Sequence, residues 1–138
     1  MIELLIVLVI AAILASIAWP AYKSQVLRGR RSDAMSALAA ISQAQERWRS
    51  DNPAYAASLS DLDARMAVSP GGHYDLSISQ GTATASAYTL RATVRSGSPQ
   101  ASDSSCQALQ MRLDAGRISY TSSNSGGANS EPDPCWVR

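Results

Sequence analysis

The feature that most constrains this 138-residue chain is an apolar run near its start. Residues 4–18 read LLIVLVIAAILASIA and contain no charge, whereas the rest of the sequence is polar and rich in Ser, Ala and Gly. As a helix the run spans about 22 Å, and Met1, Ile2, Trp19 and Tyr22 extend it toward the roughly 30 Å of a membrane core. About a hundred residues remain, enough to build a folded head with its own core.

Three interpretations of this run compete: a cleaved signal peptide, an ordinary membrane anchor, and a helix whose final partners are other helices. A signal peptide begins with basic residues, but this chain begins with an acid at Glu3. A carboxylate drawn into an apolar medium is costly without a partner, although at the membrane surface it also suits the helix dipole. Because Ala11 and Ala15 are small residues four positions apart, they let helices approach closely. We favour the third interpretation.

Charge and motifs argue against several functional classes. The chain has 12 Lys and Arg against 11 Asp and Glu, so its net charge of +1 disfavours a strongly basic nucleic-acid-binding protein. It lacks the GxSxG, Walker, HExxH and GxGxxG motifs. Its single histidine, His73, is expected at a loop or strand edge. We therefore predict no enzyme activity, no cofactor and no metal site.

The two cysteines, Cys106 and Cys135, form no C-x-x-C pair and have no nearby set of zinc ligands. A disulfide between them is the favoured interpretation, and it places the chain in an oxidising compartment. Closing a loop of about 30 residues stabilises a fold by roughly 3 to 4 kcal/mol in the chain-entropy model.

Basic residues follow the apolar run, at Lys23, Arg28, Arg30 and Arg31. By the positive-inside rule they would keep the C-terminal part in the cytoplasm, which conflicts with the disulfide. Stronger positive charge ahead of Met1, later removed, would resolve the conflict. We expect the cluster formed by Arg28, Arg30 and Arg31 to be a solvated patch beside the membrane, with contact to DNA or anionic lipid as the alternative.

Helical periodicity resumes after Pro20, so this proline is expected to kink the helix rather than end it. The predicted helix runs from about residue 2 to 50, about 70 Å, and ends before Asn52-Pro53. Its second half carries an apolar stripe at spacings of three and four, flanked by Leu38: Ala34, Ala37, Ile41, Ala44 and Trp48.

Alternating apolar residues predict strands around residues 74–78, 88–94, 109–113 and 118–120, with a turn at residues 114–116. Residues 53–72 are predicted to be a linker with a short turn near 60–64. Residues 121–134 are too polar for a core and are expected to be pinned to the sheet edge by the disulfide. The predicted fold class is α+β: a long N-terminal helix packed on an antiparallel sheet of about four strands.

The N-terminal residues resemble those of type IV pilins, in MIELLIV at 1–7, the apolar run and AWPAY at 18–22. Residues 32–52 and the closing segment from Cys106 to Cys135-Trp136 are similar to PilE-like minor pilins. One departure is Ala12, which lies where the family often has Gly in the apolar run, so local unwinding ahead of Pro20 is expected to be less extensive. The resemblance implies the pilin roll, with an apolar N-terminal helix (residues 1–31) and a globular head (residues 32–138).

The resemblance also implies a function. Glu3 matches the glutamate that pairs with the N-terminal amine of a neighbouring subunit, while Ala11, Ala15 and Pro20 fall in the helix that packs in the filament core. Met1 aligns with the third mature residue of the family, so a basic leader and two residues are expected upstream, with cleavage by a prepilin peptidase and N-methylation.

The implied protein is a structural subunit of a pilus or pilus-like filament, built from copies of itself or from several pilins, with roles in adhesion and twitching motility. It would sit in the bacterial inner membrane as a single-pass protein with a periplasmic head. The assembly machinery would then move it into an extracellular filament. The alternatives are a competence-type subunit that binds DNA or a surface, and a type II secretion pseudopilin. Major and minor subunits are not distinguished at this point.

Overall fold

The computed structural model describes residues 2–136, so the prediction made for Met1 lies outside the described residues. Its elements follow one another in the order α1 (Ile2–Asp51), α2 (Leu59–Leu62), η1 (Ala64–Ala67), β1 (Tyr74–Ile78), β2 (Ala87–Val94), η2 (Pro99–Ser102), β3 (Ala108–Asp114), β4 (Arg117–Asn124) and β5 (Gly127–Ala128).

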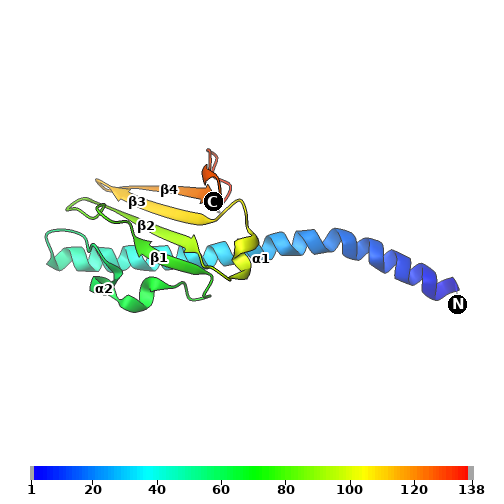
Figure 1. The fold of residues 1–138 in the computed structure, drawn as a ribbon. Helices are drawn as coiled ribbons and strands as arrows, with labels where there is room; N and C mark the ends of the chain where they lie inside the picture. Colours follow the sequence, from blue (N-terminus) through cyan, green and yellow to red (C-terminus); the bar gives the residue numbers. More distant parts are fainter. Residues whose placement is uncertain (1, 137–138) are drawn as a thin grey trace.

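The second half of α1 packs against one face of the sheet, and its first half projects away from the head as a gently curved rod (Figure 1). The sheet is antiparallel throughout, with the strands in sequence order from β1 to β5. This confirms the predicted α+β class. The predicted count of about four strands is one too low, because residues 127–128 form the short strand β5 in a segment that was too polar to predict as a strand.

The helix α1 is continuous through Pro20 and ends one residue later than predicted. Its buried residues are four of the predicted stripe, the flanking Leu38 and one addition, Gln45, while Trp48 is only half-buried. The Gln45 amide is matched to the backbone of Ala56, donating to its carbonyl at 2.9 Å and accepting from its N–H at 2.9 Å. This paired contact holds the chain after α1 against the helix without leaving a buried polar group unsatisfied.

The sheet supplies the other half of the core through alternate residues of its first three strands. Those residues face α1 and are Tyr74, Leu76, Ile78, Tyr88, Leu90, Ala92, Leu109, Met111 and Leu113. The predicted turn between β3 and β4 has positive φ at both Ala115 (48°) and Gly116 (81°). Both angles suit the type I′ hairpin turn, whose twist matches that of the flanking strands.

The predicted linker, residues 53–72, contains two short helices, α2 and η1. Ser58 caps α2 by accepting from the N–H of Ser60, and Asp63 caps η1 by accepting from the N–H of Arg65. Leu59 is buried in the main core, and Val68 forms an isolated bridge with Asp75 at the edge of β1. Residues 53–72 are therefore a packed part of the head.

Candidate functional site

The projecting half of α1 carries a large uncovered apolar surface. From Ile2 to Tyr22 every residue is exposed, and the large hydrophobic side chains are 52% to 74% accessible. The helix is long and apolar enough to cross a membrane, and none of its most apolar stretch is buried within the chain. Such a surface is stable only against lipid or other protein helices.

The residues singled out in the sequence for assembly all lie on this projecting half. Glu3, Ala11 and Ala15 are exposed, and Pro20 lies within the continuous helix. The hydroxyl of Ser16 donates to the carbonyl of Ile13 at 2.7 Å, so the one hydroxyl of the apolar run is satisfied within the helix. These residues do not pack against the rest of the chain, so their roles in packing against other subunits remain predictions.

An ion pair marks the point where α1 enters the head. Arg31 donates to Asp103 through Nε at 2.6 Å and through Nη2 at 2.9 Å, and the two side chains are 13% and 4% exposed. Gln100 adds a third hydrogen bond to the same carboxylate at 2.9 Å. The expectation that Arg31 belongs to a solvated basic patch is therefore wrong, because Asp103 draws it into the head.

Tyr74 lies in the core near this ion pair and is fully buried. Burial, reinforced by the negative charge of Asp103 and opposed by Arg31, raises the pKa of Tyr74 to about 12. Among the described residues, the Tyr74 hydroxyl and the Oε1 of Gln100 are buried without a hydrogen-bond partner. The neutral phenol is therefore the form that the fold tolerates.

A disulfide joins Cys106 and Cys135, with 5.7 Å between their Cα atoms, and both residues are buried. Around it, Asn129 donates to the carbonyl of Ser105 at 2.9 Å. Asp133 accepts from Ser122 Oγ at 2.7 Å and from the N–H of Cys135 at 2.9 Å. Covalent and polar contacts thereby hold the polar C-terminal segment against β4, in addition to the packing of Cys135 and Trp136 on the core.

The sheet face opposite α1 carries three arginines on adjacent strands: Arg91 on β2, Arg112 on β3 and Arg117 on β4. Arg91 pairs with Gln110, two residues before Arg112, and Arg112 pairs with Ser119, two residues after Arg117. The three are thus diagonal neighbours, and we call them the arginine diagonal. Diagonal Cα atoms on adjacent strands lie about 7 to 8 Å apart, so the arginine diagonal gathers positive charge on one part of this face.

A shallow hollow of about 370 Å³ lies on the same face, beside Arg91. Its lining combines polar side chains, among them Gln110, Thr121 and Asn124, with Ala108 and Ala128, and it includes no aromatic side chain. Asp114 is the acid nearest the diagonal in the register: it pairs with Arg117 in the ladder and accepts from Arg112 at 2.9 Å. Sequence reasoning missed this surface. The alternation of apolar and polar residues along each strand predicts that each arginine faces outward, but only the pairing register between strands shows that the three arginines are neighbours.

We found no arrangement of catalytic or metal-binding type in the part of the chain that the structure describes. No group of three or more His, Cys, Asp or Glu side chains is placed to hold a metal ion there. His73 precedes β1, and its Nδ1 lies 3.0 Å from the hydroxyl of Ser98. This contact links the loop before β1 to the loop before η2.

The chain matches a known protein family. A family model described as "Type IV minor pilin ComP, DNA uptake sequence receptor" matches residues 20–110, which is 91 of the 138 residues. No curated protein matches the chain. The matched region begins at Pro20 and includes the head-packing half of α1, the linker, β1, β2 and the first part of β3.

Proposed function

Since the chain belongs to the ComP family of type IV minor pilins and is a type IV pilus subunit, we propose that it joins the filament through the projecting half of α1. The observation that carries this proposal is the completely uncovered apolar helix from Ile2 to Tyr22. The family also implies association with other pilins and with the pilus machinery.

In the proposed sequence of events, the helix first lies in the inner membrane with the head in the periplasm, and later packs among other pilin helices in the extracellular filament. A helix that moves from lipid into the filament core is already shielded from water, so its gain comes from close packing against other helices and not from the hydrophobic effect. The small residues Ala11 and Ala15 serve that packing, and Pro20 belongs to the same projecting half of the helix. Glu3 is assigned to pair with the N-terminal amine of a neighbour, which makes its transfer into an apolar core tolerable.

The test compares Glu3→Ala and Glu3→Gln with the native chain in cells that assemble pili. Both variants should enter the membrane fraction normally and fall about tenfold or more in sheared filaments, because the charged partner of the amine is gone. Asp61→Ala is the matched control, since Asp61 is an exposed acid on the short helix α2. Normal incorporation of both Glu3 variants would contradict the role proposed for Glu3.

A second candidate function is binding of DNA by the head. Two observations favour it: the family is described as a receptor for a DNA uptake sequence, and the arginine diagonal lies beside a polar hollow. Guanidinium groups bind phosphate through charge and paired hydrogen bonds. Because the hollow has no aromatic lining on which unpaired bases would stack, the surface suits the backbone of a duplex better than single strands.

The head can be tested by itself as residues 25–138, because the hydrophobic core includes no residue before Ala34 and this fragment keeps Arg31. We compare the native head with a variant that changes Arg91, Arg112 and Arg117 to Gln, by fluorescence anisotropy on a labelled duplex at low salt. The Kd should rise about tenfold or more. Changing Arg47 and Arg65, two exposed arginines outside the sheet, is the control. Equal Kd values for the diagonal variant and the native head would reject this surface.

A further inference from the structure

A pocket of about 230 Å³ lies between α1 and the η2 turn, at the point where the helix leaves the head (Figure 1). Pro99 and Ser102 of η2 form one wall. The other wall is one face of α1, because its residues recur at spacings of three and four. These residues are Tyr22, Lys23, Val26, Leu27 and Arg30. The pocket is too small to enclose a drug-sized ligand, for which about 300 to 1,000 Å³ is typical, but it can hold a single polar headgroup.

The pocket begins where the apolar stretch of α1 ends. The uncovered apolar surface runs from Ile2 to Tyr22, about 31 Å of helix, which matches the roughly 30 Å of a bilayer's hydrocarbon core. Trp19 and Tyr22 are each 67% exposed and form the aromatic edge that is typical of a membrane surface. When this stretch spans a membrane, Lys23 and the pocket therefore lie in the headgroup layer of the leaflet that faces the head.

Two cations line the pocket, Lys23 and Arg30, and the described residues of its lining include no acid. In the part of the chain that the structure describes, neither cation forms an ion pair. Asp103 follows Ser102 in the chain, but it is buried and bound by Arg31. The two cations are about 10 Å apart along the helix, and the Cα–Cβ bond of a helical residue tilts toward the N-terminus, so the Arg30 side chain starts in the direction of Lys23. One phosphate group can therefore contact both.

The remaining lining of the pocket is mostly apolar and comes from Val26, Leu27 and Pro99. A free inorganic anion gains nothing from these side chains, whereas the phosphate of a phospholipid carries glycerol and acyl groups beside it that do. A choline or ethanolamine headgroup would bring a third cation to the site, which favours a lipid with net negative charge. We propose that the pocket between α1 and η2 binds the headgroup phosphate of an anionic phospholipid, held by Lys23 and Arg30. This inference rests on the membrane-inserted stage of the proposed function.

The test titrates the full chain in detergent micelles with phosphatidylglycerol, or with phosphatidylcholine of the same acyl chains, and native mass spectrometry counts the bound lipids. Phosphatidylglycerol should bind at least about fivefold more tightly. Lys23→Gln and Arg30→Gln should each raise its Kd about fivefold, since one basic group near a membrane surface contributes about that much. Arg28→Gln is the matched control, because Arg28 is exposed on the same helix but does not line the pocket, so the Kd should change by less than about twofold. Equal losses from all three variants would show a general attraction to the cationic surface and would overturn the site.

A steric variant tests the pocket itself while both cations stay in place. Ser102→Trp puts a large side chain at an exposed position of the η2 wall and should raise the Kd for phosphatidylglycerol about fivefold or more. Ser104→Trp is the control, because Ser104 is exposed and lies outside the lining of the pocket. Unchanged binding by the Ser102 variant would overturn the assignment of the lipid to this pocket.

Two competitors separate the lipid from other phosphates. Glycerol phosphate, which lacks acyl chains, and a short DNA duplex are each added in large excess, and neither should displace phosphatidylglycerol. Displacement by either would make the pocket a general phosphate site or part of a DNA-binding surface, and would overturn the lipid proposal.

Incorporation into filaments is read separately by immunoblot of the sheared fraction. A native chain that incorporates normally but does not distinguish the two lipids overturns this inference alone. Absence of the native chain from the membrane fraction overturns the membrane-inserted stage and this inference together.

Discussion

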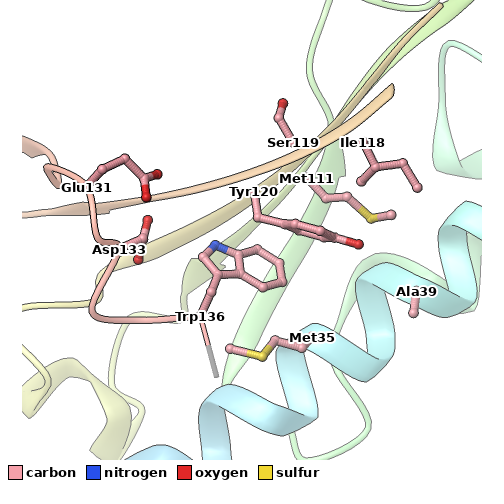
Figure 2. Close-up of a pocket in the computed structure, with 9 residues that line it drawn as sticks. All are labelled: Met35, Ala39, Met111, Ile118, Ser119, Tyr120, Glu131, Asp133 and Trp136. Atoms are coloured by element: carbon pink, nitrogen blue, oxygen red, sulfur yellow. The ribbon is translucent and has the colours of Figure 1, made fainter. Parts of the chain in front are cut away.

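Arg31 of α1 and Asp103, directly after η2, form a two-point ion pair that fastens the projecting helix to the head. Arg31 lies four residues before Met35, which lines a groove of about 680 Å³ between α1 and β4 (Figure 2). Arg31 Nη1 also lies 3.4 Å from the carbonyl of Pro134, in the segment closed by the disulfide. One side chain thus links the helix, the η2 turn and the C-terminal segment, and it adds polar contacts to the apolar packing of α1 at the point where the helix leaves the head.

Asp103→Ala should lower the free energy of unfolding of the head by about 3 kcal/mol, since it leaves Arg31 largely buried without its carboxylate and removes an acceptor from Gln100. Urea unfolding of residues 25–138 measures the change. Asp114→Ala is the control, because the pair that it breaks with Arg112 is 56% exposed on both sides and is expected to contribute less than about 1 kcal/mol. Similar losses from both variants would show that the buried pair has no special role.

Removing the disulfide by changing Cys106 and Cys135 to Ser should destabilise the head by about 2 to 5 kcal/mol. The disulfide lowers the conformational entropy of the unfolded chain. Because the C-terminal segment has few buried apolar residues, packing alone would not replace this stabilisation. Thermal unfolding of the native head with and without reductant provides the matched comparison. If the reduced native head and the Ser variant both melted at the temperature of the oxidised protein, this account would fail.

Because Tyr74 is buried, we expect the head to lose folding stability at high pH. In the unfolded chain its phenol ionises near pH 10, whereas burial raises the pKa of Tyr74 to about 12 in the fold. Between these values the unfolded state binds fewer protons than the native state, so stability falls as pH rises from about 10 to 12, by about 2 to 3 kcal/mol. Burial also raises the pKa of Tyr88, which adds to the fall in the same direction.

Tyr74→Phe isolates the contribution of Tyr74. Because the Tyr74 hydroxyl has no hydrogen-bond partner among the described residues, the variant should stay within about 1 kcal/mol of the native head at pH 7. It should then lose less stability than the native head between pH 10 and 12. Urea unfolding at a series of pH values measures both quantities, and parallel pH curves for the two proteins would refute the assignment.

Local sequence patterns predicted the main elements well. The spacing of Ala34, Ala37, Ile41 and Ala44 placed the buried face of α1, since a helical period of 3.6 residues is set by the backbone alone. Alternation likewise located β1, β2 and β3. The buried Gln45 escaped prediction, because its burial depends on the backbone of Ala56, eleven residues away, and composition carries no sign of that pairing.

The surfaces depended on contacts that are distant in sequence. The groove exists because β4 extends beyond α1, and the sequence does not specify that offset. Arg31 was expected in solvent because its partner Asp103 lies 72 residues away. The projecting helix, by contrast, was recognisable at once, since fifteen successive uncharged residues need no tertiary information to be interpreted.

The arginine diagonal predicts a specific dependence of DNA binding on salt. If Arg91, Arg112 and Arg117 each neutralise one phosphate, log Kobs should fall with log salt with a slope of about −2.7 on duplex DNA. Changing any one of them to Gln should make the slope less steep by about 1, whereas Arg65→Gln should leave it unchanged. Anisotropy titrations of the head at several salt concentrations give these slopes. A slope near zero for the native head would mean that the duplex is not bound through phosphates, and equal slopes for all variants would place the contacts elsewhere on the head.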